Sequence, residues 1–328
     1  MATTQPSGEY IQKYALHLAA VSYGSNIIAA ADIGMQLFMC IHGLSSFLTT
    51  PVERRKKRLP YIILSFSILI LSTIPACLDL AQDFRVSYYS SPHTEYLAEK
   101  RKALSSGQTA ASRCLLLAYV ALGDGLLLYR CYILWQHIAK WVVTLPILVY
   151  LGFIGVSLTT LVHVLTNDLL HSENEVTKTQ QLQIAYIFLS VTLNVIATSL
   201  ISYKILVAKR SFSKALPSRN MRVYSAVARL VIESALPLTL SGLLCAIFTA
   251  INWAHYQSPL GRPSLTIMAT ADTFGSLYYT FAALSPQMII FRVTTGRSHA
   301  DNGDFQSSLD RSSTSSRVEG GGETNYNV

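Results

Sequence analysis

Charged residues are scarce in this chain of 328 residues: Asp, Glu, Lys and Arg together make up 13% of it. That is about half the share that a soluble domain usually carries. Hydrophobic residues make up 51%, and they stand in blocks with the charges between them. The missing two-residue alternation of apolar and polar residues argues against an outer-membrane β-barrel, and a mean hydropathy of +0.35 excludes a chain that is disordered outside its ends. We therefore predict an all-α membrane protein.

Other motifs are missing as well. No Asn-x-Ser/Thr sequence occurs, so N-glycosylation is not expected. Residues 1–23 lack the basic start, short apolar run and cleavage site of a signal peptide, so the first spanning helix is expected to direct insertion. The five cysteines fit no zinc motif and no secreted disulfide framework; they are Cys40, Cys77, Cys114, Cys131 and Cys245. A bond between Cys77 and Cys114, near the outer ends of adjacent predicted helices, is one interpretation, and small buried thiols are the favoured one.

Long apolar stretches are what the sequence has in abundance. A helix needs roughly 20 mostly apolar residues to cross ~30 Å of hydrocarbon with every backbone N–H and C=O satisfied. Seven stretches qualify: 21–48, 61–80, 110–136, 141–165, 182–207, 224–251 and 265–291. They predict a seven-transmembrane helix bundle at 21–293, after an extracellular segment at 1–20. Residues 294–328 are rich in Ser, Gly, Asp and Asn, and we expect them to form a disordered cytosolic tail.

The distribution of Lys and Arg sets the expected orientation. The connections after the first and fifth stretches carry the main basic runs, at 54–58 and 209–222, and we place both in the cytosol. The N-terminus is then outside and the C-terminus cytosolic, in what we expect to be the plasma membrane. Basic loops that face anionic lipid headgroups account for the net charge of +8, so the lipid bilayer is the expected partner and a nucleic acid is not. A phosphoinositide would also suit the run at 54–58, but a topology signal is favoured.

Two connections are longer than the others. The outer loop at 82–109 contains several tyrosines, and we expect it to form a lid or to contact a ligand. The inner loop at 209–223 is basic and is the expected docking surface for a cytosolic signalling partner.

Five polar side chains fall at membrane depth, where an ionisable residue costs at least ~2.5 kcal/mol on insertion scales. They are Asp32, Asp124, Asn194, Glu233 and Asp272. Three acids with no base at comparable depth predict a cation site, protonated carboxyls, or hydrogen bonds to Ser and Thr on facing helices. Structural hydrogen bonding is favoured; for a ligand-binding site, the candidates are these residues apart from Glu233. Gly123 and Gly125 flank Asp124 and would let another helix approach closely.

A second set of residues is expected to form a switch on the cytosolic side. Arg130 in the third helix and Glu233 in the sixth lie at comparable depth, and an ion pair between them would latch the two helices together. Alternatively, Arg229 pairs with Glu233 four residues later on the same helix face while Arg130 extends toward lipid phosphate; this local pairing is slightly favoured. Pro237 and Pro286 interrupt the backbone hydrogen bonds of the sixth and seventh helices and are the candidate hinges.

The third helix carries a specific sequence. It reads Gly-Asp-Gly-Leu-Leu-Leu-Tyr-Arg-Cys-Tyr-Ile-Leu-Trp from Gly123 to Trp135 and is followed by Trp141 and Pro146. This sequence resembles that of an abundant, uncharacterised family of seven-helix, receptor-like membrane proteins in mushroom-forming basidiomycete fungi. The resemblance runs through all seven predicted helices, and it implies the topology and a fungal source more than an activity.

Better-known classes of seven-helix protein have less support. No lysine occurs at 265–291, where a microbial rhodopsin needs one to hold retinal. His42 and His163 are isolated, whereas seven-helix metal hydrolases need clustered intramembrane histidines, so no metal is expected. Arg130 and Pro286 occupy places similar to those in rhodopsin-like G-protein-coupled receptors, but Tyr129 stands where that family has an acid.

We therefore expect a receptor-like protein that senses a small or lipophilic ligand in the outer half of the bundle and signals through its cytosolic loops. The alternative is a transporter or channel in which the same acids pass a small cation, a proton or a lipophilic solute. Transporters often show two related halves, and no convincing internal repeat is present. No set of nucleophile, base and metal ligands is evident, so neither an enzyme nor a cofactor is expected.

Overall fold

Helices form almost all of the described part of the molecule. A computed structural model describes residues 8–49, 52–90, 93–104, 106–136, 140–166, 173–215, 221–256 and 264–319. Its helices are α1 (Gly8–Leu48), α2 (Val52–Tyr89), α3 (His93–Leu104), α4 (Gly107–Trp135), α5 (Lys140–Thr166), α6 (Glu173–Ala215), α7 (Met221–Tyr256) and α8 (Leu265–Glu319). The described part is therefore all-α, as predicted.

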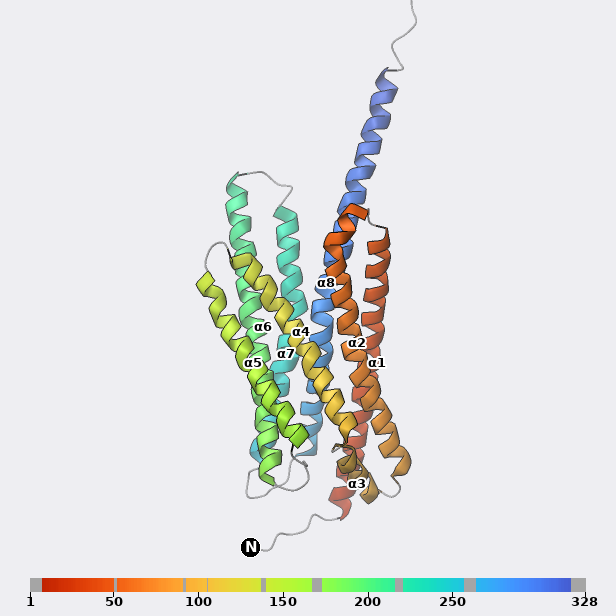
Figure 1. Cartoon of the computed structure of the whole chain (residues 1–328), viewed down its shortest axis with the longest axis vertical. Helices are drawn as coiled ribbons and strands as arrows, with labels where there is room; N and C mark the ends of the chain where they lie inside the picture. Colours follow the sequence, from red (N-terminus) through yellow and green to blue (C-terminus); the bar gives the residue numbers. More distant parts are fainter. Residues whose placement is uncertain are drawn as a thin grey trace, which may run out of the picture.

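The seven long helices pack as one closed bundle. Going around it, each helix contacts the next in the order α1, α2, α4, α5, α6, α7, α8, and α8 contacts α1 again. α4 also contacts α6 and α8, so it crosses the interior of the bundle. The short helix α3 lies at the end of the bundle where α1 begins, and α8 ends beyond the opposite end (Figure 1).

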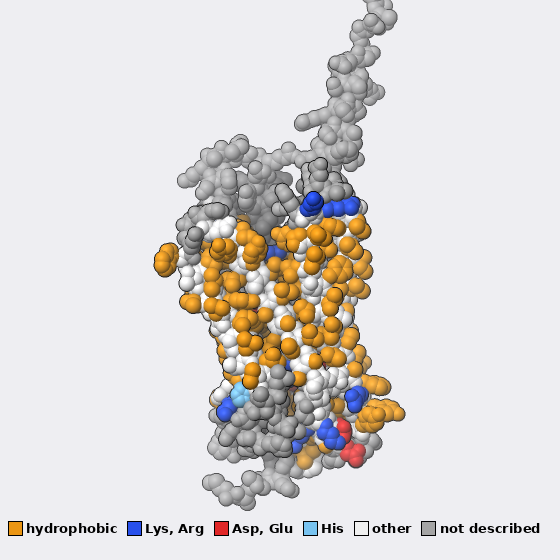
Figure 2. Space-filling model, viewed as in Figure 1, with side chains coloured by type: hydrophobic (Ala, Val, Ile, Leu, Met, Phe, Trp, Pro, Cys, Tyr) orange, Lys and Arg blue, Asp and Glu red, His pale blue; other side chains and the backbone are white. Residues whose placement is uncertain are grey.

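Six helices contain stretches that are long and apolar enough to cross a membrane. These stretches are Gly8–Leu48, Arg58–Tyr89, Gly107–Trp135, Trp141–His163, Gln181–Val207 and Ala235–His255. Large apolar side chains such as Phe38, Leu151 and Leu240 are exposed on their outer faces. Figure 2 shows hydrophobic side chains covering the middle of the molecule, while most of the coloured Lys and Arg side chains lie toward its two ends. This distribution fits contact with lipid rather than water, and the chain is an integral membrane protein.

The seventh predicted stretch, 265–291, is the first part of α8 and is not among those six. Protein surrounds much of this part: Tyr278 and Ala283 are fully buried, and Ile290 is 2% exposed. A helix enclosed by its neighbours presents little surface to lipid, so it can carry polar residues such as Asp272 that lower its hydropathy.

α8 continues to Glu319 and so enters the segment that the sequence predicts to be disordered. Side chains after Arg292 lie outside the described residues. The Ser, Gly, Asp and Asn residues of this segment have low helix propensity, and its disorder in water stays a prediction.

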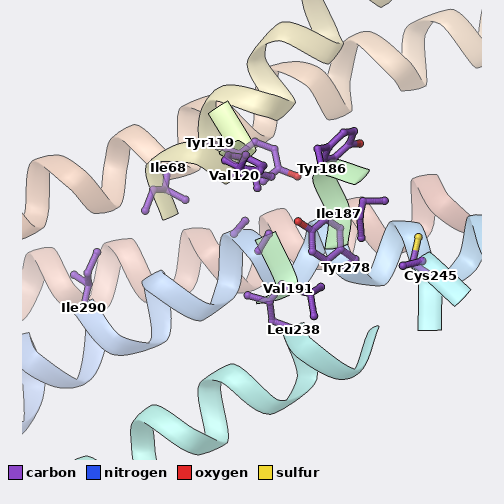
Figure 3. Close-up of a cluster of buried hydrophobic side chains, with 14 residues drawn as sticks. Ile68, Tyr119, Val120, Tyr186, Ile187, Val191, Leu238, Cys245, Tyr278 and Ile290 are labelled. Carbon is purple, nitrogen blue, oxygen red and sulfur yellow. The ribbon is translucent and has the colours of Figure 1, made fainter. Parts of the chain in front are cut away.

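A cluster of buried side chains holds the middle of the bundle together. Tyr119, Ile187, Val191 and Tyr278 belong to it, and they come from α4, α6 and α8 (Figure 3). Gly242 of α7 lets these helices approach closely, because a Cβ there would lie 2.5 Å from Val191 Cγ2 and 2.8 Å from Tyr278 Cδ2. The result is a tightly packed layer across the bundle.

All five cysteines are free thiols. Cys77 and Cys114 are exposed and do not form the disulfide that was one interpretation of their positions. The favoured interpretation, small buried thiols, holds for the other three cysteines and is wrong for this pair. Lipid is the medium around exposed residues of a spanning helix, so a thiol there needs no protein partner.

Candidate ligand cavity

A cavity of about 680 Å³ occupies the end of the bundle where α1 begins. All eight helices contribute to its lining, which includes Asp32 of α1, Tyr119 of α4 and Asp272 of α8. Pockets for small molecules usually measure roughly 300–1,000 Å³ and combine apolar walls with a few polar groups. The cavity therefore has the size of a small-molecule site.

Asp32 is held at the wall of this cavity by a short chain of hydrogen bonds. Ser72 Oγ donates to Gln36 Oε1 at 3.1 Å, and Gln36 Nε2 donates to Asp32 Oδ2 at 2.9 Å. Asp32 is only 6% exposed, and its second oxygen, Oδ1, is buried with no hydrogen-bond partner. Oδ2 of Asp32 is thus hydrogen-bonded within the protein, whereas Oδ1 has no hydrogen-bond donor there.

Asp272 also lines the cavity, but its side chain is exposed there rather than enclosed. The neighbouring turn of α8 is tied to α1 by Ser25 and Ser276, whose hydroxyl oxygens lie 2.7 Å apart. None of the ion pairs within the described residues involves Asp32 or Asp272. Both carboxylates that the sequence singled out on α1 and α8 therefore face one cavity without a cationic partner.

Helix α3 covers part of the cavity rim. Lys100 of α3 forms an ion pair with Asp83 of α2 and donates to Ser22 Oγ of α1 at 3.2 Å. Asn26 Nδ2 donates to the other oxygen of Asp83 at 3.1 Å. Burial, with a smaller contribution from the charge of Asp83, raises the pKa of the Tyr96 hydroxyl on the same helix. The predicted lid is thus a helix that contacts α1 and α2 and contributes Lys100 to the lining.

Four charged lining residues escaped the sequence analysis: Asp79, Asp83, Lys100 and Arg113. Asp79 and Asp83 are four residues apart on α2, a spacing that places both on one helix face. That spacing was the available signal, since two acids near the end of an apolar stretch are expected on a face that meets water or protein. The sequence did not single out Lys100, because it lies in a cluster of basic residues of the kind expected in an exposed loop.

Asp124 belongs to a different site, on the other side of the packed layer. Ser190 Oγ donates to Asp124 Oδ2 at 2.6 Å, and Asn194 Nδ2 donates to Oδ1 at 2.8 Å. Asp124 is 5% exposed and Asn194 3%. Asp124 and Asn194 thus form a hydrogen-bonded link between α4 and α6, which is the structural hydrogen bonding that the sequence favoured. Ligand binding by these two residues stays a prediction.

The glycines beside Asp124 act as the sequence indicates. A Cβ on Gly123 would lie 3.3 Å from the backbone oxygen of Ala282 in α8, and a Cβ on Gly125 would lie 3.0 Å from the hydroxyl of Tyr150 in α5. The Tyr150 hydroxyl in turn donates to the backbone oxygen of Ala121 at 3.1 Å. Both glycines therefore allow close packing of α4 against its neighbours.

The residues of the predicted switch are not joined to one another. Arg130 lines a small pocket of about 20 Å³ next to Asp124, and its Nη2 is buried with no hydrogen-bond partner. No ion pair among the described residues links Arg130 to Glu233, whose side chain is exposed. The side chains of Arg229 and of the docking loop at 209–223 lie outside the described residues. The latch is therefore not formed in this conformation, and the local pairing with Arg229 stays a prediction.

The two candidate hinge prolines lie inside helices. Pro237 is within α7, where its carbonyl accepts from Ser241 Oγ at 2.7 Å, and Pro286 is within α8 beside Gly123. Pro286 also lines the small pocket with Asp124 and Arg130. Bending at these prolines stays a prediction.

Comparison with known proteins gives no family for the chain. None of the protein-family models, curated proteins or solved structures compared with it matches. Its helices, its exposed apolar belt and its candidate spans identify it as a helical membrane protein that crosses the bilayer several times.

Proposed function

We propose that this protein is a receptor-like, seven-transmembrane protein of a fungal plasma membrane that binds a small ligand in the cavity lined by Asp32 and Asp272. Binding in the outer half of the bundle is transmitted to the cytosolic ends of the helices. The observation that carries this proposal is the contrast between a cavity of about 680 Å³ at one end and a packed layer beneath it, beyond which the pocket at Asp124 measures about 20 Å³.

The seventh crossing in this proposal is the first part of α8. It runs through the bundle between α1 and α7, and seven crossings place the start of the first helix and the end of the last on opposite sides. Arg55 and Arg58 are in the first two turns of α2, which begins at the end of the bundle remote from α3 (Figure 1), and Arg292 follows the first part of α8. Because basic residues favour the cytosolic side, the cavity faces outside.

The proposed membership in the family of basidiomycete membrane proteins rests on the sequence at 123–135. One face of this sequence lies in the interior of the bundle: Asp124, Cys131 and Trp135 are buried, and Gly123 packs against α8, whereas Tyr129 is exposed. Trp135 also stacks with Tyr203 of α6, with ring centroids 6.4 Å apart. A sequence that fixes helix packing in this way is expected to mark a fold more than a ligand.

The route from the cavity to the cytosolic end passes along α8. This helix supplies Asp272 to the cavity, Tyr278 to the packed layer and Pro286 to the small pocket. A ligand that pulls on Asp272 would act on the same helix that packs against Gly123 and lines the small pocket together with Arg130. This continuity supports signalling through a movement of α8 against α4.

Thermal-shift screening of the purified full chain, combined with flux measurements in sealed vesicles, tests the proposal. A receptor is expected to gain thermal stability with its ligand and to pass neither that ligand nor protons across the vesicle membrane. Ligand-dependent flux would instead support the alternative, a transporter or channel for a small cation, proton or lipophilic solute.

A matched pair of substitutions on α2 tests whether the ligand binds in the cavity. Ala76→Phe fills the cavity, whereas Ala81→Phe adds the same ring at an exposed position outside the lining. The stabilising compound is expected to lose its effect on Ala76→Phe and to keep it on Ala81→Phe. Equal stabilisation of both variants would place the ligand elsewhere and contradict the proposal.

A further inference from the structure

The charges that line the cavity are not balanced. Four carboxylates and two cationic side chains line it: Asp32, Asp79, Asp83, Asp272, Lys100 and Arg113. Lys100 is already paired with Asp83 and further anchored by Ser22. Asp32 and Asp272 have no ion-pair partner among the described residues, so the unpaired negative charge includes one acid on α1 and one on α8.

Asp32 is the acid of the cavity that most clearly lacks a hydrogen-bond donor. Its Oδ2 accepts from Gln36, while Oδ1 is buried without a donor. A buried acceptor without a donor is unfavourable, and more so when it is charged. The hydrogen bond from Gln36, itself held by Ser72, fixes Oδ2, while Asp32 as a whole lines the cavity. Because Oδ1 is buried, a small rotation of the Asp32 side chain would bring it within reach of a donor from a ligand.

The walls around the acids are apolar and aromatic. Leu116, Leu117, Tyr119 and Met268 line the cavity together with Tyr279. Tyr119 is itself fixed, since its hydroxyl donates to the backbone oxygen of Tyr279 at 3.3 Å. Such walls bind an apolar or aromatic body, and tyrosine faces also attract a cation.

The arrangement of the acids distinguishes an organic cation from a metal ion. Among the residues that the structure describes, no three His, Cys, Asp or Glu side chains lie close enough together to hold a metal. The carboxylates are instead spread around a large cavity, on α1, α2 and α8. A metal ion requires converging ligands, whereas an ammonium group on a larger body requires one carboxylate and a wall.

We propose that the cavity binds an organic cation, a protonated amine carried on an aromatic or apolar body, whose ammonium group pairs with the carboxylate of Asp32. Asp272 supplies a second, weaker attraction from α8, and the leucine and tyrosine walls hold the body. This assignment rests on the proposed function for the cavity itself and adds the chemical class of the ligand.

Three compounds with the same indole body and different charges test the proposal. Tryptamine carries an ammonium group, tryptophol a hydroxyl group and indole-3-propionate a carboxylate. Binding of each is measured by calorimetry on the purified full chain in lipid nanodiscs, with empty nanodiscs as the reference for partition into lipid. Tryptamine is expected to bind roughly tenfold or more tighter than tryptophol, and indole-3-propionate weakest, because only the amine can neutralise the carboxylates.

Substitutions assign the preference to particular carboxylates. Asp32→Asn keeps the side-chain size and an acceptor for Gln36, and it is expected to lower the affinity for tryptamine about tenfold while leaving that for tryptophol unchanged. Asp272→Asn gives a smaller loss and serves as the second variant if Asp32→Asn does not fold. Glu9→Gln removes an exposed carboxylate that pairs with Lys13 outside the cavity, and it is expected to change neither affinity.

The outcomes separate this assignment from the proposed function. If tryptophol or indole-3-propionate binds as tightly as tryptamine, or if none of the three binds, the cation assignment is wrong. The receptor proposal then still depends on its own screen with Ala76→Phe and Ala81→Phe. If tryptamine binds through Asp32 but is also carried into sealed vesicles, the assignment stands and the receptor function fails.

Discussion

Asp32 and Asp124 are both buried acids in the interior of the same bundle, yet their surroundings differ. Both oxygens of Asp124 accept hydrogen bonds from α6, and the pocket beside it has room for about one water molecule. Asp32 has one oxygen bonded within its own helix and the other without a donor, at the wall of a cavity of about 680 Å³. Asp124 therefore completes a link between helices, whereas Asp32 is available to a ligand.

The largest expected effect comes from breaking the link at Asp124. Asp124→Ala removes the acceptor of Ser190 Oγ and one of the two acceptors of Asn194 Nδ2, which also donates to the backbone oxygen of Ser190 at 3.0 Å, and we expect a loss of about 2 kcal/mol in the free energy of unfolding. Thermal denaturation of the purified chain measures it. Ser190→Ala removes only one of the two bonds and is expected to cost about half as much. An unchanged melting temperature for Asp124→Ala would show that this acid is not a structural link.

A smaller change in stability is expected when either of two glycines, one on each side of the boundary between the cavity and the packed layer, is replaced by alanine. Gly242→Ala places a Cβ 2.5 Å from Val191 Cγ2 and 2.8 Å from Tyr278 Cδ2, and overpacking of this kind costs about 1–2 kcal/mol. Gly275→Ala lies at the cavity, where the nearest atom, Cys245 Sγ, is 3.5 Å away. We expect Gly275→Ala to keep or raise the melting temperature, since alanine favours a helix. Equal losses in both variants would mean that the cavity wall is as tightly packed as the layer beneath it.

The sequence predicted much of the fold, because the apolar length of a spanning helix is a local property. Six of the seven predicted stretches overlap candidate spans, although the bounds differ, as for 224–251 against Ala235–His255. The first part of α8 differs because its neighbours, which are remote in sequence, replace lipid around it. Helix α3 was expected only as a loop, since nothing in a single polar stretch shows that it will pack on α1 and α2.

The candidate site was harder to predict than the fold. Hydropathy gave the depth of Asp32, Asp124 and Asp272 but not their partners, so all three were grouped into one site. Whether a carboxylate is satisfied depends on single serine and amide side chains such as Ser190 and Gln36. Such residues are common in spanning helices, and their sequence positions do not reveal which helix faces them.

The smallest expected effect is that of Asp32→Asn on the stability of the unliganded protein, which we expect to change by less than about 0.5 kcal/mol. Asparagine still offers an oxygen to Gln36 Nε2, and it replaces a charged acceptor that has no donor with a neutral amide that is cheaper to bury. Thermal denaturation of Asp32→Asn and Asp124→Asn, both without any added amine, compares the two losses of stability directly. Asp124→Asn turns one of two satisfied acceptors into a donor facing Ser190 or Asn194, so its loss should exceed that of Asp32→Asn by at least about 1 kcal/mol. If Asp32→Asn were the more destabilised of the two, Asp32 would be the structural acid, and the contrast between the two sites would be reversed.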